Sequence, residues 1–472
     1  MATIAAHNDA ERLNELASGS IGRLLWHYSI PAVVGMLVMS LYNVIDRIFI
    51  GQGVGPEAIA GLTITFPVMN LSAALGVLIG AGSSARVSIM LGASNHKGAL
   101  MVLGNSLTLI VLIAAVYISC FALFLDEILL AFGANEVTLP YARDFMMYIL
   151  PGMFIMNISF SFNNIMRASG YPLRAMVTMF IGAGFNIIFA PLFIFGLGWG
   201  IKGAAIATDI AMTISAVFVM AHFMRPGSIL HFTKGTFRLH GSIVWGIITI
   251  GAAPSLVNFA ASVINAIINH SLLRYGGELA TEAIAAAGIL TTYTSLLVMV
   301  IVGMCQGMQP IVGYNYGAGL MHRLKRAYWL TCLWATVICS LGAAFAMVCP
   351  QYIARAFSPD ARLIEVTSNT LIIATQAFWV VGFQVVSTNF MQSLGKATLS
   401  IVLSLSRQVI FLIPLLLLLP PHFGLDGIWM AFPSSDLLAA LITGSIMVWE
   451  MHQISKMTKK QSEVKLFAYI CV

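Results

Sequence analysis

The stretch Leu107–Leu125, LTLIVLIAAVYISCFALFL, runs for 19 residues without a charge. A helix of about 20 apolar residues crosses the ~30 Å hydrocarbon core of a bilayer. The whole chain has a similar character, since its 472 residues are 59% hydrophobic and 9% charged, whereas soluble domains carry about 25% charged residues. We therefore expect an all-α membrane protein for which the bilayer is the solvent.

Polar, glycine and proline clusters divide the rest of the chain into similar segments. About twelve have membrane-spanning length, namely residues 24–50, 58–90, 99–124, 137–166, 172–196, 201–224, 243–272, 282–312, 325–348, 361–392, 397–418 and 426–450. The residues before the first span are polar, and no small-residue cleavage site follows a short apolar core. We therefore expect no removable signal peptide, and the first apolar segment should remain as a helix.

Basic residues gather in alternate connections between these spans. If the N-terminus is cytoplasmic, 18 of the 24 Lys and Arg residues lie on the cytoplasmic side, among them Arg86, Arg167 and Arg407. Cytoplasmic connections of membrane proteins are enriched in Lys and Arg. We therefore predict a multi-pass protein of the plasma membrane, in bacteria the inner membrane, with both termini cytoplasmic. This distribution explains the net charge of +6 as topology, and we expect no nucleic-acid partner.

The chain resembles itself at a shift of about 225 residues. Matched landmarks are Pro31 with Pro254, Ala58–Ala60 with Ala283–Ala285, Gly92 with Gly317, Asn164 with Asn389, Pro191 with Pro414, and Gly200 with Gly424. An even number of spans in each half gives the halves parallel topology. We predict two pseudo-symmetric six-helix bundles, with tails at both ends and a basic linker between: an N-terminal tail 1–23, an N-lobe 24–224, a linker 225–241, a C-lobe 242–450 and a C-terminal tail 451–472.

Three motifs suggest a family. They are Ile30-Pro31 at the start of the first span, LYNVIDRIFIG at 41–51, and Gln309-Pro310 followed by YNYGA at 314–318. Together they resemble the multidrug and toxic compound extrusion (MATE) family, over nearly the whole chain. The resemblance implies a monomeric antiporter, with no enzymatic activity and no cofactor. It would export small, often cationic amphipathic drugs, antibiotics among them, in exchange for H⁺ or Na⁺ by alternating access.

The chain is similar to the bacterial branch whose cation site lies in the N-lobe. That resemblance implies an ion-coupling site at Asp46, Asn186 and Thr208, but the position of its second acid holds Ala190. Asp209 beside Thr208 is a candidate to supply the missing charge. The oxygen atoms of Asp46, Asn186 and Thr208 suit Na⁺, and we expect no other metal site. The alternative for Asp46 is an interfacial ion pair with its neighbour Arg47.

Further polar residues lie within the predicted spans. Asp436 is a possible second polar site, or else a structural contact that Ser434 and Ser435 satisfy. Substrate should bind in the cleft between the lobes, near the middle of the membrane. Candidate residues for this cleft are Tyr42, Asn43, Asn164, Asn265, Gln306 and Gln309. The 26 Met residues are compatible with an adaptable cavity, but the pattern singles out no individual methionine.

Two other functions compete with drug export. A lipid-linked saccharide flippase of the same superfamily would need a cleft lined with cations, whereas the predicted lobe interiors hold acids and few bases. A membrane-embedded enzyme would need clustered His, Asp, Ser or Cys in the bilayer, but the His residues lie near span ends or in connections. Composition alone also allows an ion channel, which a duplicated two-lobe chain does not favour.

Overall fold

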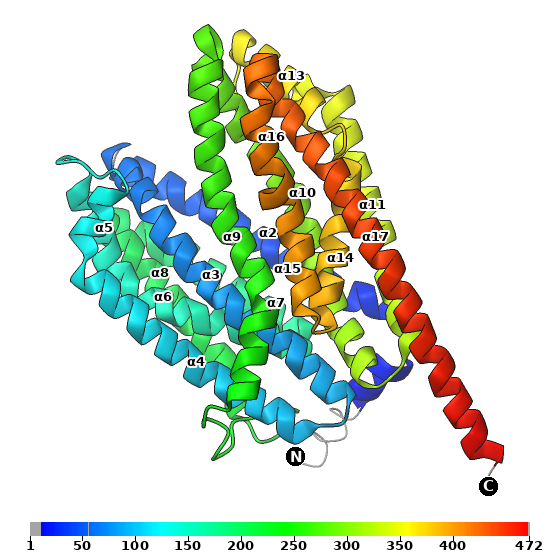
Figure 1. Cartoon of the computed structure of the whole chain (residues 1–472). Coiled ribbons are helices and arrows are strands. Elements are labelled where there is room, and N and C mark those ends of the chain that lie inside the picture. The colour runs from blue at the N-terminus through cyan, green and yellow to red at the C-terminus, as the bar shows by residue number, and fades with distance from the viewer. Residues whose placement is uncertain (1–10, 55, 471–472) are drawn as a thin grey trace.

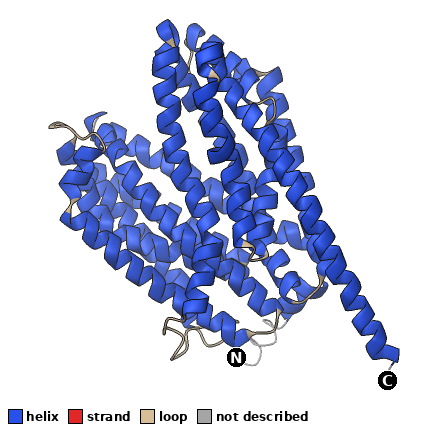
Figure 2. Ribbon diagram, in the orientation of Figure 1, coloured by secondary structure: helices blue, strands red, loops and turns tan. Residues whose placement is uncertain are grey.

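The computed structural model describes residues 11–54 and 56–470. Figure 2 shows that helices make up almost all of this part of the chain, with short loops between them. In hydrocarbon, backbone N–H and C=O groups have no water partner, so a spanning segment must satisfy them internally, as an α-helix does. Eleven helical segments in the described part are long and apolar enough to cross a membrane, and a bent pair brings the number to twelve. The predicted all-α membrane fold is confirmed.

The N-lobe comprises the following elements: α2 (Ile21–Gly53), α3 (Pro56–Gly92), α4 (His96–Leu123), α5 (Leu125–Ala131), α6 (Leu139–Ala168), α7 (Pro172–Pro191), η1 (Leu192–Gly196) and α8 (Gly200–Met224). The C-lobe comprises α9 (Gly241–Tyr275), η2 (Gly277–Leu279), α10 (Ala280–Gly317), α11 (Met321–Val348), α12 (Pro350–Phe357), α13 (Ala361–Ala374), η3 (Phe378–Val380), α14 (Val381–Ser393), α15 (Ala397–Leu405), η4 (Ser406–Leu412), α16 (Ile413–Leu418) and α17 (Pro420–Ile470).

Two predicted segments differ in detail. The span predicted at 361–392 is broken between α13 and α14, which meet at an angle of 55°. Phe378 N–H bonds to Thr375 and Val380 N–H to Ala377, and these tighter i to i+3 bonds replace α-helical ones at the bend. Helix α17 is kinked at Gly424, and its helical structure continues past the predicted end of the last span to Ile470.

The repeat predicted from sequence extends to the backbone. Helices α4 and α11 begin and end 225 residues apart, and the short helices α5 and α12 also begin 225 residues apart. Residues with positive φ recur in matched pairs: Ser94 (57°) with Gly319 (72°), Gly170 (98°) with Gly395 (73°), and Gly200 (55°) with Gly424 (59°). Connections as well as helices therefore follow the duplication.

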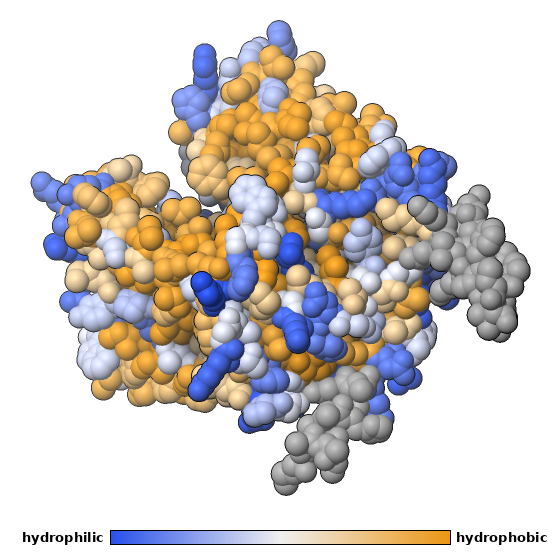
Figure 3. Space-filling model, turned by 60° about the horizontal axis from the view of Figure 1, so that its bottom comes forward, coloured by the Kyte–Doolittle hydropathy of each residue, from blue (hydrophilic) through white to orange (hydrophobic). Residues whose placement is uncertain are grey.

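The two lobes converge at the end of the molecule that carries both chain termini and diverge toward the opposite end (Figure 1). We call the first the terminus end. Seen obliquely from there, hydrophilic residues gather over the terminus end while the flanks are mostly apolar (Figure 3). Exposed apolar side chains such as Val116 (72%) and Leu341 (66%) are expected where lipid surrounds the protein.

Glycines make the contact between the lobes at the terminus end, which we call the lobe seam. On α10, Gly303 packs against Val33, Gly307 against Ser29 of α2, and Gly317 against the Ile89 carbonyl of α3. Between α3 and α9, Gly82 meets the Ile247 carbonyl and Gly251 meets the Leu78 carbonyl. Small residues let helix backbones approach closely in membranes, where van der Waals packing drives association. The seam therefore closes the terminus end.

A strap formed by residues 11–18, which are helical, crosses this end between the lobes. Arg12 Nη1 donates to the Gly170 carbonyl of the N-lobe (3.3 Å). Leu16 is 1% exposed and packs in the C-lobe core, and its carbonyl accepts from Asn315 Nδ2 and Arg323 Nη2, both at 3.2 Å. Leu13 packs against the cores of both lobes. The strap thus adds a second connection across the seam.

Gly251→Ala should destabilise the protein through the seam. Its new methyl carbon would lie 1.7 Å from the Leu78 carbonyl oxygen, and overpacking of this kind costs ~1–3 kcal/mol. The matched control is Gly288→Ala in α10, which meets no atom within 4 Å and should be neutral or slightly stabilising. Thermal unfolding in detergent measures both changes. Equal Tm values for the two variants would show that the seam is not tightly packed.

Candidate functional site

Two of the residues expected to form an ion-coupling site are in direct contact. Asn186 on α7 is 1% exposed, and its Nδ2 donates to Thr208 Oγ1 on α8 at 2.9 Å. Thr208 Oγ1 in turn donates to the Ala204 carbonyl (3.0 Å). These hydrogen bonds join α7 to α8. They use the side-chain nitrogen of Asn186, so its side-chain oxygen remains available as an acceptor.

Asp46 lies on α2 at the same level. Helices α2 and α7 lie side by side and run in the same direction, because Gly35 packs against Met179 and Gly53 against Ile194. Interpolation between these contacts places Asp46 at the height of Asn186 along the helix axes, to within about one helical turn. The side chain of Arg47 lies outside the described residues, so the alternative pairing of Asp46 with Arg47 stays a prediction.

The other two positions of the expected site face different surroundings. Ala190 is fully buried in an apolar cluster with Ile50 and Ile194, so this position adds no charge. The Asp209 carboxylate lies against α6, where a methyl carbon on Gly152 would come within 1.6 Å of Oδ1. Because successive residues on a helix are about 100° apart, Thr208 faces α7 while Asp209 faces α6.

An apolar cavity of about 240 Å³ lies next to this polar group. None of its lining residues is charged, and six of them are methionines: Met36, Met39, Met156, Met179, Met212 and Met299. Residues from both lobes line it, with Asn157 and Asn163 from the N-lobe and Gln306 from the C-lobe. Sequence could not single out these methionines, because apolar residues surround a membrane helix on every side.

Tyr42 lies between the cavity and Asp46. It is buried against Met39, Met156 and Met212, which also line the cavity, and Asp46 follows four residues later on the same face of α2. Asp46 is thus seven residues, about two helical turns, from Met39, the nearest lining residue on α2.

The remaining cleft candidates are placed differently. Gln306 lines the cavity, whereas Gln309 Nε2 reaches across the seam to the Ala81 carbonyl (3.4 Å). Asn43 is exposed and donates to the Met39 carbonyl of its own helix. Asn265 is exposed on α9. Asn164 donates to the Phe160 carbonyl and accepts from Arg167. Of the six candidates, Gln306 lines the cavity and Tyr42 packs against its methionines, whereas Asn43 and Asn164 bond to the backbone of lining residues, Met39 and Phe160.

Arg167 was expected in a cytoplasmic connection, but this placement is wrong. It lies in the last turn of α6 and is 2% exposed. Its guanidinium donates to Asn163 Oδ1 (3.0 Å) and Asn164 Oδ1 (3.3 Å), and across the seam to Gln306 Oε1. Asn163 precedes Arg167 by four residues, which places both on one face of α6. That spacing was the one sequence signal available for this contact.

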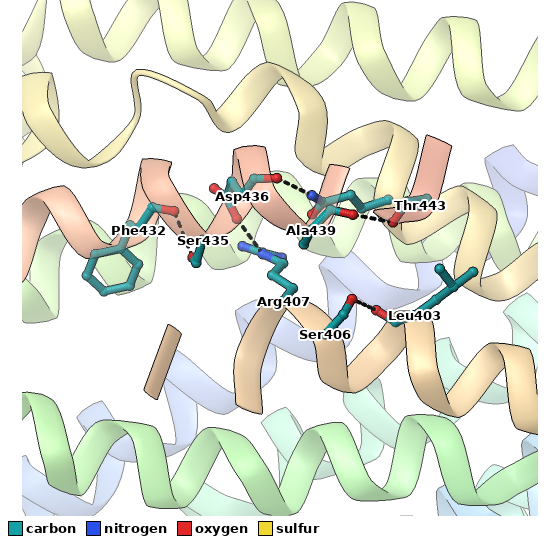
Figure 4. Close-up of polar contacts among 9 residues, drawn as sticks. Leu403, Ser406, Arg407, Phe432, Ser435, Asp436, Ala439 and Thr443 are labelled. Carbon is teal, nitrogen blue, oxygen red and sulfur yellow. Dashed lines mark hydrogen bonds and ion pairs between the residues drawn. The ribbon is translucent and has the colours of Figure 1, made fainter. Parts of the chain in front are cut away.

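In the C-lobe, Asp436 has a partner that the sequence did not suggest. Arg407, expected on the cytoplasmic side, lies instead in the π-helical segment η4 and donates from Nε to Asp436 Oδ1 at 2.7 Å (Figure 4). Ser435, one of the two expected partners, bonds to the Phe432 carbonyl instead. Gln384 Nε2 donates to the Asp436 backbone carbonyl. Asp436 is 3% exposed, so the ion pair compensates a buried charge.

No group of three or more His, Cys, Asp or Glu side chains that could hold a metal ion occurs in the part of the chain that the structure describes. Asp46, Asn186 and Thr208 offer one carboxylate and neutral oxygen atoms. Such a set can accept a proton at the carboxylate or contribute oxygen ligands to a hard cation.

Asp436→Asn should destabilise the C-lobe strongly, because it leaves the partly buried Arg407 guanidinium without a counter-charge. Breaking a buried ion pair in this way costs ~3–5 kcal/mol. The double variant Arg407→Met with Asp436→Leu removes both charges and should recover most of that loss. The control is Asp144→Asn, which breaks an exposed pair with Lys202 and should cost under ~1 kcal/mol. Thermal unfolding in detergent tests this order, and a double variant no more stable than the single one would contradict it.

Comparison with known proteins adds to this geometry. The MatE family model matches residues 31–192 and 253–418. The chain is 28% identical over 436 residues to a Shewanella oneidensis protein named FAD transporter, covering 90% of this chain and 94% of that protein. It is 24% identical over 433 residues to the multidrug export protein MepA of Staphylococcus aureus, covering 91% and 94%. One solved structure, described as the outward-facing conformation of a multidrug resistance MATE family transporter, has a TM-score of 0.86 at 26% identity, covering 94% and 98%.

Proposed function

Because this chain belongs to the MatE family of membrane transporters, we propose that it exports small amphipathic organic molecules in exchange for inward-moving H⁺ or Na⁺. The observation that carries the proposal is the methionine-lined cavity, which N-lobe helices form together with Met299 and Gln306 of the C-lobe. It lies one helical turn from Asn186 and Thr208, at Gly182 and Met212 of the same helices. One site for an organic molecule and one for an ion, a helical turn apart, are what coupled exchange requires.

Alternating access follows from the seam. The lobes touch at the terminus end and diverge at the other (Figure 1), so a rocking motion that opens the seam would expose the cavity to the terminus side. With both termini in the cytoplasm, as the charge distribution predicts, the present arrangement is the outward-facing one. Transport outward then requires the seam to open, admit a substrate and close again.

The cavity wall favours a broad range of substrates. Methionine is unbranched and polarizable, so it can repack around different apolar shapes. With no charged residue on the wall, binding depends on shape, dispersion and the amides of Asn157, Asn163 and Gln306. A flippase for lipid-linked saccharides would need several cations lining this wall to hold a pyrophosphate, whereas none of the lining residues is charged, so the cavity disfavours that alternative.

Coupling would act through α2. This helix carries Asp46 at one level and, nearer the terminus end, the residues Ser29 and Val33 that contact α10. A proton or Na⁺ at Asp46 changes the charge between α2 and α7, and α2 would pass a small shift to the seam. Tyr42, on the same helix, would pass it to the cavity wall.

A second candidate substrate class is the flavin nucleotides. One relative is named FAD transporter, and the absence of any acid from the cavity wall means that the wall itself does not select cations. Two substrate classes are therefore open: the organic cations predicted from the sequence, and anionic aromatic compounds.

The test is dye and drug efflux from bacterial cells that lack their own exporters. Efflux should depend on the chain and should fall when Na⁺ is removed or when the proton gradient is collapsed, whichever ion is coupled. Efflux that survives both treatments unchanged would rule out the antiport proposal.

Asp46→Asn should abolish ion-coupled efflux while the protein still folds, because the amide can neither take up a proton nor carry a charge to Na⁺. Efflux in cells and size-exclusion elution in detergent measure the two properties. Asp144→Asn, at an exposed pair, is the control and should transport normally. Asp209→Asn separates the two acids, since full coupled efflux from it would remove Asp209 from the coupling site. Wild-type efflux from Asp46→Asn would place the site elsewhere.

A further inference from the structure

Arg167 is a buried cation whose partners are all neutral. It is 2% exposed, and its three hydrogen bonds go to the amide oxygens of Asn163, Asn164 and Gln306. Its Nε has no acceptor, and none of the ion pairs found among the described residues includes it. A charged residue within the membrane region is costly and usually serves a function.

The position of Arg167 joins the cavity to the seam. Two of its partners, Asn163 and Gln306, line the cavity, so the guanidinium lies directly behind the wall. Asn163 and Arg167 belong to α6 of the N-lobe, whereas Gln306 belongs to α10 of the C-lobe, between the seam residues Gly303 and Gly307. The Arg167–Gln306 hydrogen bond is therefore a contact between lobes as well as part of the cavity floor.

Opening of the seam must break this contact. When α10 separates from the N-lobe at the terminus end, Arg167 loses the Gln306 oxygen and keeps only the two amides of its own helix. At least two N–H groups of the guanidinium, including Nε–H, are then without an acceptor. An arginine fork of this kind binds a carboxylate or phosphate through two parallel hydrogen bonds.

We propose that Arg167 binds the anionic group of an amphipathic aromatic substrate when the terminus end is open, and that Gln306 displaces this group when the seam closes. The inference rests on the proposed export function and specifies its substrate class as organic anions bearing a carboxylate, sulfonate or phosphate. Arg167 thus donates hydrogen bonds to two acceptors in turn: the anionic group of the substrate during loading, and Gln306 during release. The predicted preference for organic cations is reversed, because Arg167, which donates to the lining residues Asn163 and Gln306, is positively charged.

Two dyes with the same tricyclic ring system and opposite charge test the proposal: fluorescein as the anion and rhodamine 123 as the cation. Binding of each dye to purified protein in detergent is measured by fluorescence polarization, and transport is measured in proteoliposomes. Wild-type protein should bind fluorescein. In Arg167→Gln that binding should weaken about tenfold or more, as expected for losing hydrogen bonds to a charged group, while rhodamine binding stays the same or tightens.

Gln306→Ala should have the opposite effect on the anion. It removes the acceptor that competes for Arg167, so fluorescein should bind more tightly and leave more slowly. A purely structural role of Arg167 would make both variants weaken both dyes, since each loses the same contact between lobes. Arg167→Lys keeps the charge without the fork and should fall between wild type and Arg167→Gln. If Arg167→Gln does not elute as a folded protein, Arg167→Lys takes its place in the binding measurements.

The control for losing an arginine is Arg143→Gln, which breaks an exposed pair with Asp126 and should bind both dyes as wild type does. Wild-type protein that binds no fluorescein, or an Arg167→Gln effect equal for the two dyes, would overturn the proposal. Charge-selective binding without any ion-dependent transport would instead support Arg167 as the anion site and count against the antiport function. The two failures are therefore distinguishable.

Discussion

Close backbone packing between the lobes is the contact on which the other features depend. At the lobe seam, glycines of α3, α9 and α10 lie against carbonyl groups of the facing helices, and a single added methyl at Gly251 would lie 1.7 Å from an oxygen atom. Packing this tight is either made or broken, because a close-packed interface does not deform gradually. The closed seam fixes the floor of the cavity, holds Gln306 beside Arg167, and determines which end of the molecule is open.

Three ionisable side chains within the helices are stabilised in three ways. Asp436 is neutralised by Arg407 within one lobe, an arrangement that gives it a structural partner. Asp46 lies on α2 at about the level of Asn186 and Thr208, whose oxygen atoms are neutral. Arg167 is held by amide oxygens alone, one of them from the opposite lobe. The two lobes therefore resemble each other in backbone structure more than in the placement of their charged residues.

Much of the fold was accessible from sequence because the bilayer imposes long apolar runs and because the chain is duplicated. The duplication is as clear in the paired φ values of Gly200 and Gly424 as in the amino-acid sequence. The contact between Asn186 and Thr208 was implied by the family resemblance and is observed at 2.9 Å. The positions of Arg167 and Arg407 were not predicted, because a basic residue near a span end normally faces water and its burial depends on a neighbour distant in sequence. The cavity methionines were inaccessible for the same reason, and no glycine or proline marks the break between α13 and α14.

The strap has a practical consequence for handling the protein. Residues 11–18 hold Arg12 on the N-lobe and Leu16 in the C-lobe core, so a fusion partner attached just before them would pull on both lobes at once. A bulky label there would compete with the closed seam and alter the balance of conformers in any preparation. Helix α17 instead extends beyond the lobes at its C-terminal end (Figure 1). Affinity handles and fluorescent reporters therefore belong at the C-terminus if the purified protein is to keep its native distribution of states.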